Sequence, residues 1–272
     1  MKKLSSIALV VVLSMILYCC HEEKESQAVE SNENVGVEYE EFSTSRTPED
    51  DANLEVIIYF MIPKSNVTAS LDSIRADLVS FYTDNSRREI QSGIEIFADS
   101  IESQFYDFRN KIGAEKSKLI NYEIYYDSIY PEFEGGSLLV FYNSHYEYEG
   151  GAHEISENVY RVYDMTTGKR VTENDIFVMN DTTKRILSEM INAAIDMEYF
   201  NDLDDIWNNG DSNVNGNFSI SEDSLYYQYQ PYDYGPNSLG MPKVALPKDL
   251  LKPLLKKDGP LYEYWYPEKK KK

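Results

Sequence analysis

The sequence predicts an α+β fold, a mainly antiparallel sheet with amphipathic helices packed on it. Two long stretches before residue 113 carry apolar residues at helical spacing. From about residue 119, apolar and polar residues alternate instead, and glycine-containing turns separate the alternating runs. The hydrophobic fraction of 42% is sufficient for a packed core and too high for general disorder.

The first strand is expected at residues 54–62, a β-branched and aromatic run that ends before Pro63. A helix follows, because apolar residues then recur every three or four positions: Val67, Leu71, Ile74, Leu78 and Phe81. Ser65 or Asn66 is the expected N-cap of this helix.

A second amphipathic helix is expected after the polar residues 83–86. Its apolar positions keep a three-to-four spacing over some 23 residues: Ile90, Ile94, Phe97, Ile101, Phe105, Phe108 and Ile112. A coiled coil with a partner chain would have the same spacing. The neighbouring strand-rich sequence favours packing on a sheet.

Strands dominate the second half of the chain. Alternating or β-rich runs lie at residues 122–126, 137–148, 153–163, 170–172, 217–220, 224–230 and 243–246. One further helix, at about residues 182–199, is indicated by Ile186, Met190, Ile191, Ala194 and Ile195. Strands interleaved with a few helices indicate the α+β class.

A glycine pair, Gly150 and Gly151, predicts a hairpin turn between two of these strands. A two-residue turn gives the register of two histidines: His153 lies opposite Tyr148, and His145 lies opposite Ser156. Positions 145 and 148 then point to opposite faces of the sheet, so the two histidines are not expected to share a metal ion. The expected role of His153 is a hydrogen bond that holds the turn, and the alternative is acid–base or metal chemistry.

The N-terminus has the features of a bacterial lipoprotein signal. Lys2 and Lys3 precede an apolar run at residues 7–17, which is too short for the roughly 20 residues of a spanning helix. Residues 17–20, Leu-Tyr-Cys-Cys, resemble a lipobox with Cys20 as the lipid acceptor. An ordinary secretory peptide with two incidental cysteines is the alternative. Without residues 1–19 no second cysteine is left for a disulfide or thiol chemistry, and the net charge changes from −21 to −23.

These signals predict five segments. They are a signal peptide at 1–19, an acidic flexible tether at 20–51, a strand plus helices at 52–118, a β-rich domain at 119–266 and a basic tail at 267–272. The acidic start of the tether resembles the surface-export signal of some Gram-negative lipoproteins, and a plain solvated linker is the alternative. We therefore expect an outer-membrane lipoprotein that faces the periplasm or the cell surface. The lysine tail is expected to be solvated rather than bound to anionic lipid or lipopolysaccharide.

Three segments carry a family resemblance. They are residues 146–153 (Tyr-Glu-Tyr-Glu-Gly-Gly-Ala-His), residues 163–177 with a Thr-Gly-Lys turn, and residues 229–236 (Tyr-Gln-Pro-Tyr-Asp-Tyr-Gly-Pro). These segments resemble a family of bacterial extracytoplasmic domains that occurs in the lysozyme-sensing anti-sigma factor RsiV and beside the catalytic domain of the peptidoglycan deacetylase PdaC. The resemblance covers about residues 54–256 and implies no deacetylase activity, because the metal-binding catalytic domain has no counterpart here. The residues expected to bind a ligand are Gly150, Gly151, His153, Pro231, Tyr232 and Tyr234.

Residues 211–222 match the pattern of an EF-hand calcium loop. The ligand positions are Asp211, Asn213, Asn215 and Glu222, with Gly216 at the turn. An EF-hand also needs a helix leaving the loop, whereas residues 224–234 alternate like a strand. A polar loop that enters a strand is therefore the preferred interpretation, with no metal or other cofactor.

The expected function is a lipid-anchored, non-catalytic binding or sensing module of the cell envelope. The 47 acidic against 26 basic residues oppose nucleic-acid binding. The same charge would attract a basic protein such as lysozyme, and the 23 tyrosines would suit peptidoglycan or another glycan. No nucleophile elbow, zinc-protease, P-loop or dinucleotide motif occurs. The alternatives are an envelope enzyme that acts on glycan through His153, and a structural lipoprotein with no ligand.

Overall fold

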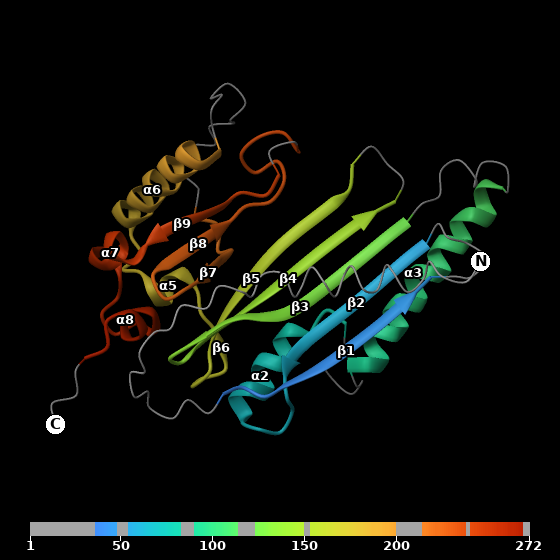
Figure 1. The fold of residues 1–272 in the computed structure, drawn as a ribbon, viewed down its shortest axis with the longest axis horizontal. Helices are drawn as coiled ribbons and strands as arrows, with labels where there is room; N and C mark the ends of the chain where they lie inside the picture. The colour runs from blue at the N-terminus through green and yellow to red at the C-terminus, as the bar shows by residue number, and fades with distance from the viewer. Residues whose placement is uncertain are drawn as a thin grey trace, which may run out of the picture. The chain divides into compact units, whose positions relative to one another are not determined.

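The computed structural model describes residues 36–47, 54–82, 90–113, 123–149, 153–199, 214–237 and 240–268. Within these ranges the chain forms a six-stranded sheet, β1 to β6, and a three-stranded sheet, β7 to β9 (Figure 1). All strand pairs are antiparallel except the parallel pair of β2 with β3, which confirms the predicted α+β class. The predicted signal peptide and Cys20 lie outside the described ranges. No helix in the described part of the chain is long and apolar enough to cross a membrane.

The strands of the six-stranded sheet follow chain order across the sheet. Their bounds are β1 Tyr39–Arg46, β2 Leu54–Pro63, β3 Glu123–Gly135, β4 Leu138–Tyr148, β5 Ile155–Asp164 and β6 Lys169–Arg170. Strand β1 corrects the prediction that residues 20–51 are all tether. It is an edge strand whose inward positions include Glu40, Thr44 and Arg46, so it carries little of the apolar alternation that marks a strand in sequence.

Helices α2 (Ala69–Leu78) and α3 (Ile90–Ile112) cover one face of this sheet. Helix α3 has the predicted bounds, and its buried residues pack on β1 and β2 rather than forming a coiled-coil seam. The N-cap of α2 is Thr68, not Ser65 or Asn66, because the Thr68 hydroxyl accepts a hydrogen bond from Leu71 N at 3.2 Å. The helix is therefore shorter than predicted, and Val67 and Phe81 flank it as exposed residues. The polar residues 83–86 lie outside the described ranges.

The β4–β5 hairpin differs from its predicted register by one residue. His145 lies opposite Glu157, and Ser156 lies opposite Tyr146. The ladder ends at the pair Glu147–Ile155, so the connection between the strands is longer than the two-residue turn that the register assumed. His153 consequently lies before β5 and has no partner residue on β4.

The remaining elements form the second sheet and its helices. Their bounds are α5 Glu173–Ile176, α6 Asp181–Tyr199, β7 Phe218–Ile220, β8 Ser224–Gln228, β9 Lys243–Pro247, α7 Lys248–Leu251, the 3₁₀ helix η3 Lys252–Leu254 and α8 Pro260–Trp265. Helix α6 and strands β7 to β9 match the predicted positions closely. The four short helices α5, α7, η3 and α8 were not predicted, because three to six residues are too few to show a helical period.

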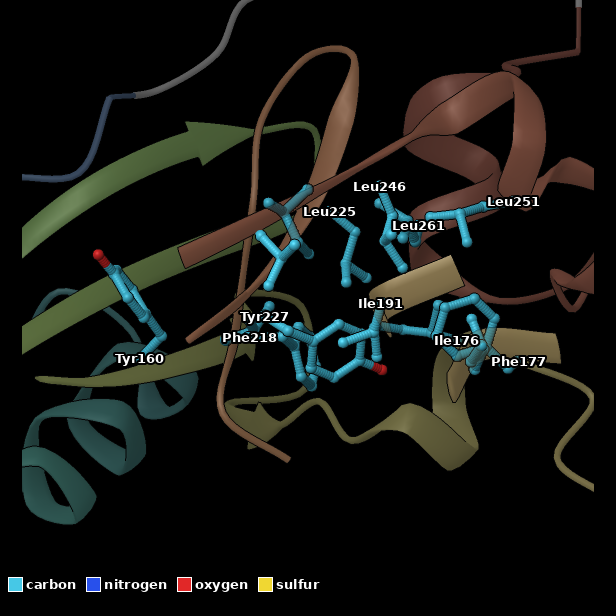
Figure 2. Packing of buried hydrophobic residues seen from close by; sticks show 14 of the residues in the cluster. Tyr160, Ile176, Phe177, Ile191, Phe218, Leu225, Tyr227, Leu246, Leu251 and Leu261 are labelled. Atoms are coloured by element: carbon cyan, nitrogen blue, oxygen red, sulfur yellow. The ribbon is translucent and has the colours of Figure 1, made fainter. Parts of the chain in front are cut away.

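Two hydrophobic cores lie on opposite faces of the six-stranded sheet. Leu139 and Phe141 of β4 belong to the core under α2 and α3, whereas Leu138 and Val140 belong to the core shared with α6 and the second sheet. Figure 2 shows the second core, in which Phe218 and Tyr227 of the small sheet lie near Ile191 of α6. Because alternate residues of one strand serve the two cores, β4 fixes the second sheet against the first.

Candidate functional site

An open cavity of about 640 Å³ lies beside β5. Its wall is formed by β5, β6, the start of α5, the loop before β7 and the loop after β8. Most of its polar lining consists of three carboxylates, one guanidinium and three amides: Glu157, Glu173, Asp233, Arg170, Asn215, Asn217 and Gln230. Val159 and Val171 add apolar surface. The cavity can therefore hold a ligand with both a charged and an apolar part.

Two amide side chains join the second sheet to the edge of β5. Asn217 Oδ1 accepts from Tyr160 N at 2.8 Å, and Asn217 Nδ2 donates to Asn158 O at 2.8 Å. Gln230 Oε1 accepts from Asn158 N at 3.0 Å, and Gln230 Nε2 donates to the same Asn158 carbonyl at 2.8 Å. These amides replace the neighbouring strand that β5 lacks here, which satisfies its backbone groups and fixes this wall of the cavity.

Two of the lining carboxylates are held by backbone amides. Glu173 Oε1 accepts from Gly216 N at 2.7 Å, and Asp233 Oδ2 accepts from Gln230 N at 2.6 Å. Gly216 has φ +75°, a conformation that suits glycine and turns its N–H toward Glu173. An ionised carboxylate has about four acceptor positions, so Glu173 can accept hydrogen bonds beyond the one from Gly216.

The position of Glu173 is set by the N-terminus of α5. Thr172 and Asp175 form a capping box: the backbone N and the hydroxyl of Thr172 both donate to Asp175 Oδ2, at 2.9 and 2.7 Å. Both hydrogen bonds lower the pKa of Asp175, and the bond from the backbone N–H of Thr172 has the larger effect.

The negative charge of the cavity also affects a buried tyrosine. Burial, and then the negative charge of Glu173, raise the pKa of Tyr227, whose hydroxyl has no hydrogen-bond partner among the described residues. With three carboxylates against Arg170, the cavity favours a cation.

The structure places the predicted binding residues in different surroundings. Pro231 and Tyr232 form the loop that leads from Gln230 to Asp233, so they lie at the border of the cavity, and the Tyr232 side chain is 48% exposed. Tyr234 is instead buried, with its ring 4.6 Å from that of Tyr229, and it serves the core. His153 is exposed and does not line the cavity. Gly150 and Gly151 lie outside the described residues.

The calcium-loop pattern leads into a strand. Asp211 and Asn213 lie outside the described residues, and the chain continues from Asn217 into β7 without forming a helix, as preferred from the sequence. Asn215 Oδ1 accepts from Asn217 N at 3.0 Å, and Asn215 Nδ2 donates to the carbonyl of Gln228 at 2.8 Å. Glu222 lies in the turn between β7 and β8. In the described ranges, no three His, Cys, Asp or Glu side chains are arranged to hold a metal ion.

A second titratable cluster lies on the sheet face that carries α2 and α3. Asp127 of β3 is 7% exposed, and its Oδ1 accepts from Asn143 Nδ2 at 2.6 Å. Burial raises the pKa of Asp127 to about 6, while Asn143, His145 and Arg161 oppose this rise. His145 Nε2 lies 3.5 Å from Glu147 Oε2. His145 thus lies on β4 within this cluster, whereas His153 precedes β5 and is exposed.

Sequence reasoning missed most of the cavity. Glu157, Arg170 and Glu173 come together only through the tertiary fold, and among 47 acidic residues no pair stands out. One local signal was available: Thr172 followed three residues later by Asp175 has the spacing of a capping box. Asp127 also had a signal, because it occupies an inward position between Tyr125 and Ile129 in an alternating strand.

Comparisons with known proteins give a family of unknown function. Residues 174–249, which run from α5 into α7, match the family model described as "Protein of unknown function (DUF3298)". The fold is similar to the crystal structure of a DUF3298 family member from Bacteroides fragilis, with a TM-score of 0.73, 16% identity, and coverage of 85% of this chain and 97% of that chain. A DUF3298 family protein from Pseudomonas aeruginosa has a TM-score of 0.54 and 14% identity, and the match covers 81% of this chain and 95% of that chain. No curated protein matches the sequence. The matched segment supplies Asn215, Asn217, Gln230 and Asp233 of the cavity wall.

Proposed function

We propose that the protein is a non-catalytic, lipid-anchored binding module of the cell envelope, and that the cavity beside β5 receives a cationic side chain of a basic protein. The observation that carries the proposal is the excess of carboxylates in this cavity, where Glu157, Glu173 and Asp233 face a single Arg170. The lipobox-like residues 17–20 support the envelope location. The resemblance to lysozyme-sensing domains supports a lysozyme-like partner.

The charge and shape of the cavity suit a lysine or arginine side chain. Its methylene groups would contact Val159 and Val171, and its charged end would reach the carboxylates. The exposed ring of Tyr232 at the border provides the aromatic contact that interfaces favour. The net charge, −21 for the whole chain and −23 without residues 1–19, would speed the encounter with a basic protein, and this effect weakens as salt is added.

Titration of the full chain in mild detergent with lysozyme tests the proposal. We expect Glu157→Gln to weaken binding about tenfold, which corresponds to about 1.4 kcal/mol. The matched control is Glu189→Gln on α6, which removes the same charge at a site that does not line the cavity and where Glu189 pairs with Arg185 at the surface. We expect this control to change the affinity less than twofold.

Two results would overturn the proposal. The first is an equal loss in both variants, because it would mean that the total charge and not the cavity attracts the partner. The second is an absence of lysozyme binding at low salt. His153 lies outside the cavity, so the cavity does not support the enzyme alternative in the form that uses His153.

A further inference from the structure

The sheet face that points away from α2 and α3 carries ordered rows of tyrosine. In the first row, Tyr126 of β3 lies directly opposite Tyr146 of β4, with the rings stacked at 5.9 Å and 28°. In the second row, Tyr130 lies opposite Tyr142, and Tyr142 lies opposite Tyr160 of β5. The ring centroids of these two pairs are 5.2 and 4.9 Å apart. We call these two rows and the residues between them the tyrosine face.

A strip of small polar side chains separates the two rows. Ser128 of β3 lies opposite Ser144 of β4, midway between the rows, and Tyr59 of β2 lies beside Ser128. Four residues along a strand span about 13 Å, so this is the distance between the rows at the backbone. Because serine is much shorter than tyrosine, the phenol rings flank a polar strip that a flat ring-shaped ligand could occupy.

The tyrosine face is accessible to solvent. Tyr130 is 38% exposed, and Ile57, which lies beside Tyr126 in the first row, is 36% exposed. Tyr126 and Tyr146 are half-buried. By contrast Tyr125, the neighbour of Tyr126 in sequence, points to the opposite face and is buried. Tyr160, at the end of the second row, is only 5% exposed and belongs to the core shared with the second sheet, and Tyr142 packs against that core. The apolar surface open to a ligand is therefore provided by Tyr126, Tyr130 and Tyr146.

The charges on the tyrosine face exclude some ligand classes. Tyr126 Oη donates to Glu55 Oε2 at 2.5 Å, so a carboxylate lies beside the first row. At the end of the second row, Lys243 is paired with Glu132 at 3.0 Å and lies over the Tyr160 ring at 4.4 Å. A surface of carboxylates, neutral phenols and a paired lysine repels polyanions such as nucleic acid and sulfated polysaccharides.

The hydrogen-bonding groups of the tyrosine face suit hydroxyl and amide groups of a ligand. Tyr142 Oη donates to Asn158 Oδ1 at 2.6 Å, and Ser128 and Ser144 add two hydroxyls that can donate and accept. Burial raises the pKa of both Tyr130 and Tyr142, so these phenols stay neutral at physiological pH. Rings that provide apolar faces next to neutral donors and acceptors match pyranose rings, which have one C–H face and a rim of hydroxyls.

We propose that the tyrosine face binds an uncharged polysaccharide chain built of N-acetylhexosamine or related pyranose units. Sugar rings stack on the tyrosine rows, and their hydroxyl and amide groups bond to the serine strip, Glu55 and Asn158. This site is separate from the cavity beside β5 and binds a different class of ligand, so it does not depend on the function proposed above.

A soluble hexamer of N-acetylglucosamine, titrated into the full chain in mild detergent, tests this inference. We expect Tyr126→Ala and Tyr146→Ala each to weaken hexamer binding at least tenfold. The control is a second contacting tyrosine pair, Tyr262 and Tyr266 of the α8 region, whose rings are 5.2 Å apart and tilted by 46°. We expect Tyr262→Ala and Tyr266→Ala to change the affinity less than twofold.

Additional variants and ligands distinguish loss of binding from loss of folding, identify the source of the sugar, and show which site binds it. Tyr126→Phe keeps the ring, so we expect less than a threefold loss of hexamer affinity. This variant remains informative if an alanine variant unfolds.

A comparison of ligands identifies the source of the sugar. If peptidoglycan fragments bind more tightly than the hexamer, the wall glycan is the source, and equal affinities would indicate a general site for such sugars. We expect Glu157→Gln to leave hexamer binding unchanged, so failure of the lysozyme experiment would leave this inference standing. No hexamer binding by the unmodified chain, an equal loss in the control variants, or a preference for a sulfated polysaccharide would overturn it.

Discussion

The two faces of strand β2 differ sharply in composition and exposure. The five residues that point toward α2 and α3 are all fully buried: Leu54, Val56, Ile58, Phe60 and Ile62. The residues between them, Glu55, Ile57, Tyr59 and Met61, point to the other face and are partly or largely accessible. One strand therefore contributes to a closed hydrophobic core on one face and to a solvent-accessible surface on the other. Tyrosine suits the accessible face, because its ring is apolar and its hydroxyl can bond to water.

The same contrast divides the tyrosines themselves. Tyr125 and Tyr163 point to the covered face and are buried in its core, whereas Tyr126, Tyr130 and Tyr146 belong to the tyrosine face. The total of 23 tyrosines in the chain does not distinguish these roles. Strand register does, because neighbouring residues of a strand point in opposite directions.

The largest expected effect comes from truncating neighbouring residues on the two faces. We expect Phe60→Ala to lower the free energy of unfolding by about 3–5 kcal/mol, because it leaves a cavity in a closed core. Tyr59→Ala, one residue earlier on the half-exposed face, should lower it by less than about 1.5 kcal/mol. Urea unfolding of both variants measures the difference. Equal losses of unfolding free energy would mean that water is excluded from both faces to the same extent, which would contradict the difference in burial between Phe60 and Tyr59.

Sequence reasoning predicted the fold well where the hydrophobic signal was strong. Helix α3 and strand β2 have long apolar patterns, and both lie where the patterns placed them. Strand β1 was missed because Phe42 is its one large apolar residue among inward positions otherwise occupied by Glu40, Thr44 and Arg46. The β4–β5 register was wrong by one residue because it depended on an assumed turn length.

The candidate sites were less predictable than the fold. The resemblance directed attention to Pro231 and Tyr232, which border the cavity, but it also included Tyr234, which belongs to the core. The carboxylates of the cavity come from β5, α5 and the loop after β8, so only the tertiary structure brings them together. The rows of the tyrosine face likewise require the register of β3 with β4, which no single-strand pattern contains.

A second, smaller effect is expected from Asp127, a carboxyl group buried on the sheet face that α2 and α3 cover. Burial raises the pKa of Asp127 to about 6, above its usual value near 3.8, so the folded state binds this proton more tightly than the unfolded state. The stability that the proton contributes is present in full below about pH 4 and is lost as the pH rises through about 6. Asp127→Asn should remove this loss and make the protein more stable than the unmodified chain at pH 7, by on the order of 2 kcal/mol.

Urea unfolding at several pH values between 4 and 7 measures this change. The control is Asp107→Asn on the exposed side of α3, which removes the same charge without removing a buried group. A parallel pH dependence in Asp127→Asn and the unmodified chain would contradict the prediction, since it would place the titrating group elsewhere.

The smallest expected effect compares two tyrosine hydroxyls that make the same bond on opposite faces. Tyr163 Oη donates to Asp77 Oδ2 at 2.5 Å from within the covered core, and Tyr126 Oη donates to Glu55 Oε2 at 2.5 Å on the tyrosine face. Tyr163→Phe should cost about 1–2 kcal/mol, because the Tyr163 side chain is fully buried and loses a bond to a charged carboxylate, even though Asp77 itself is exposed and can be rehydrated. Tyr126→Phe should cost less than about 0.5 kcal/mol, because water can take the place of its hydroxyl. Thermal unfolding measures both, and an equal cost would mean that the tyrosine face is as inaccessible to water as the core and therefore closed to a polysaccharide.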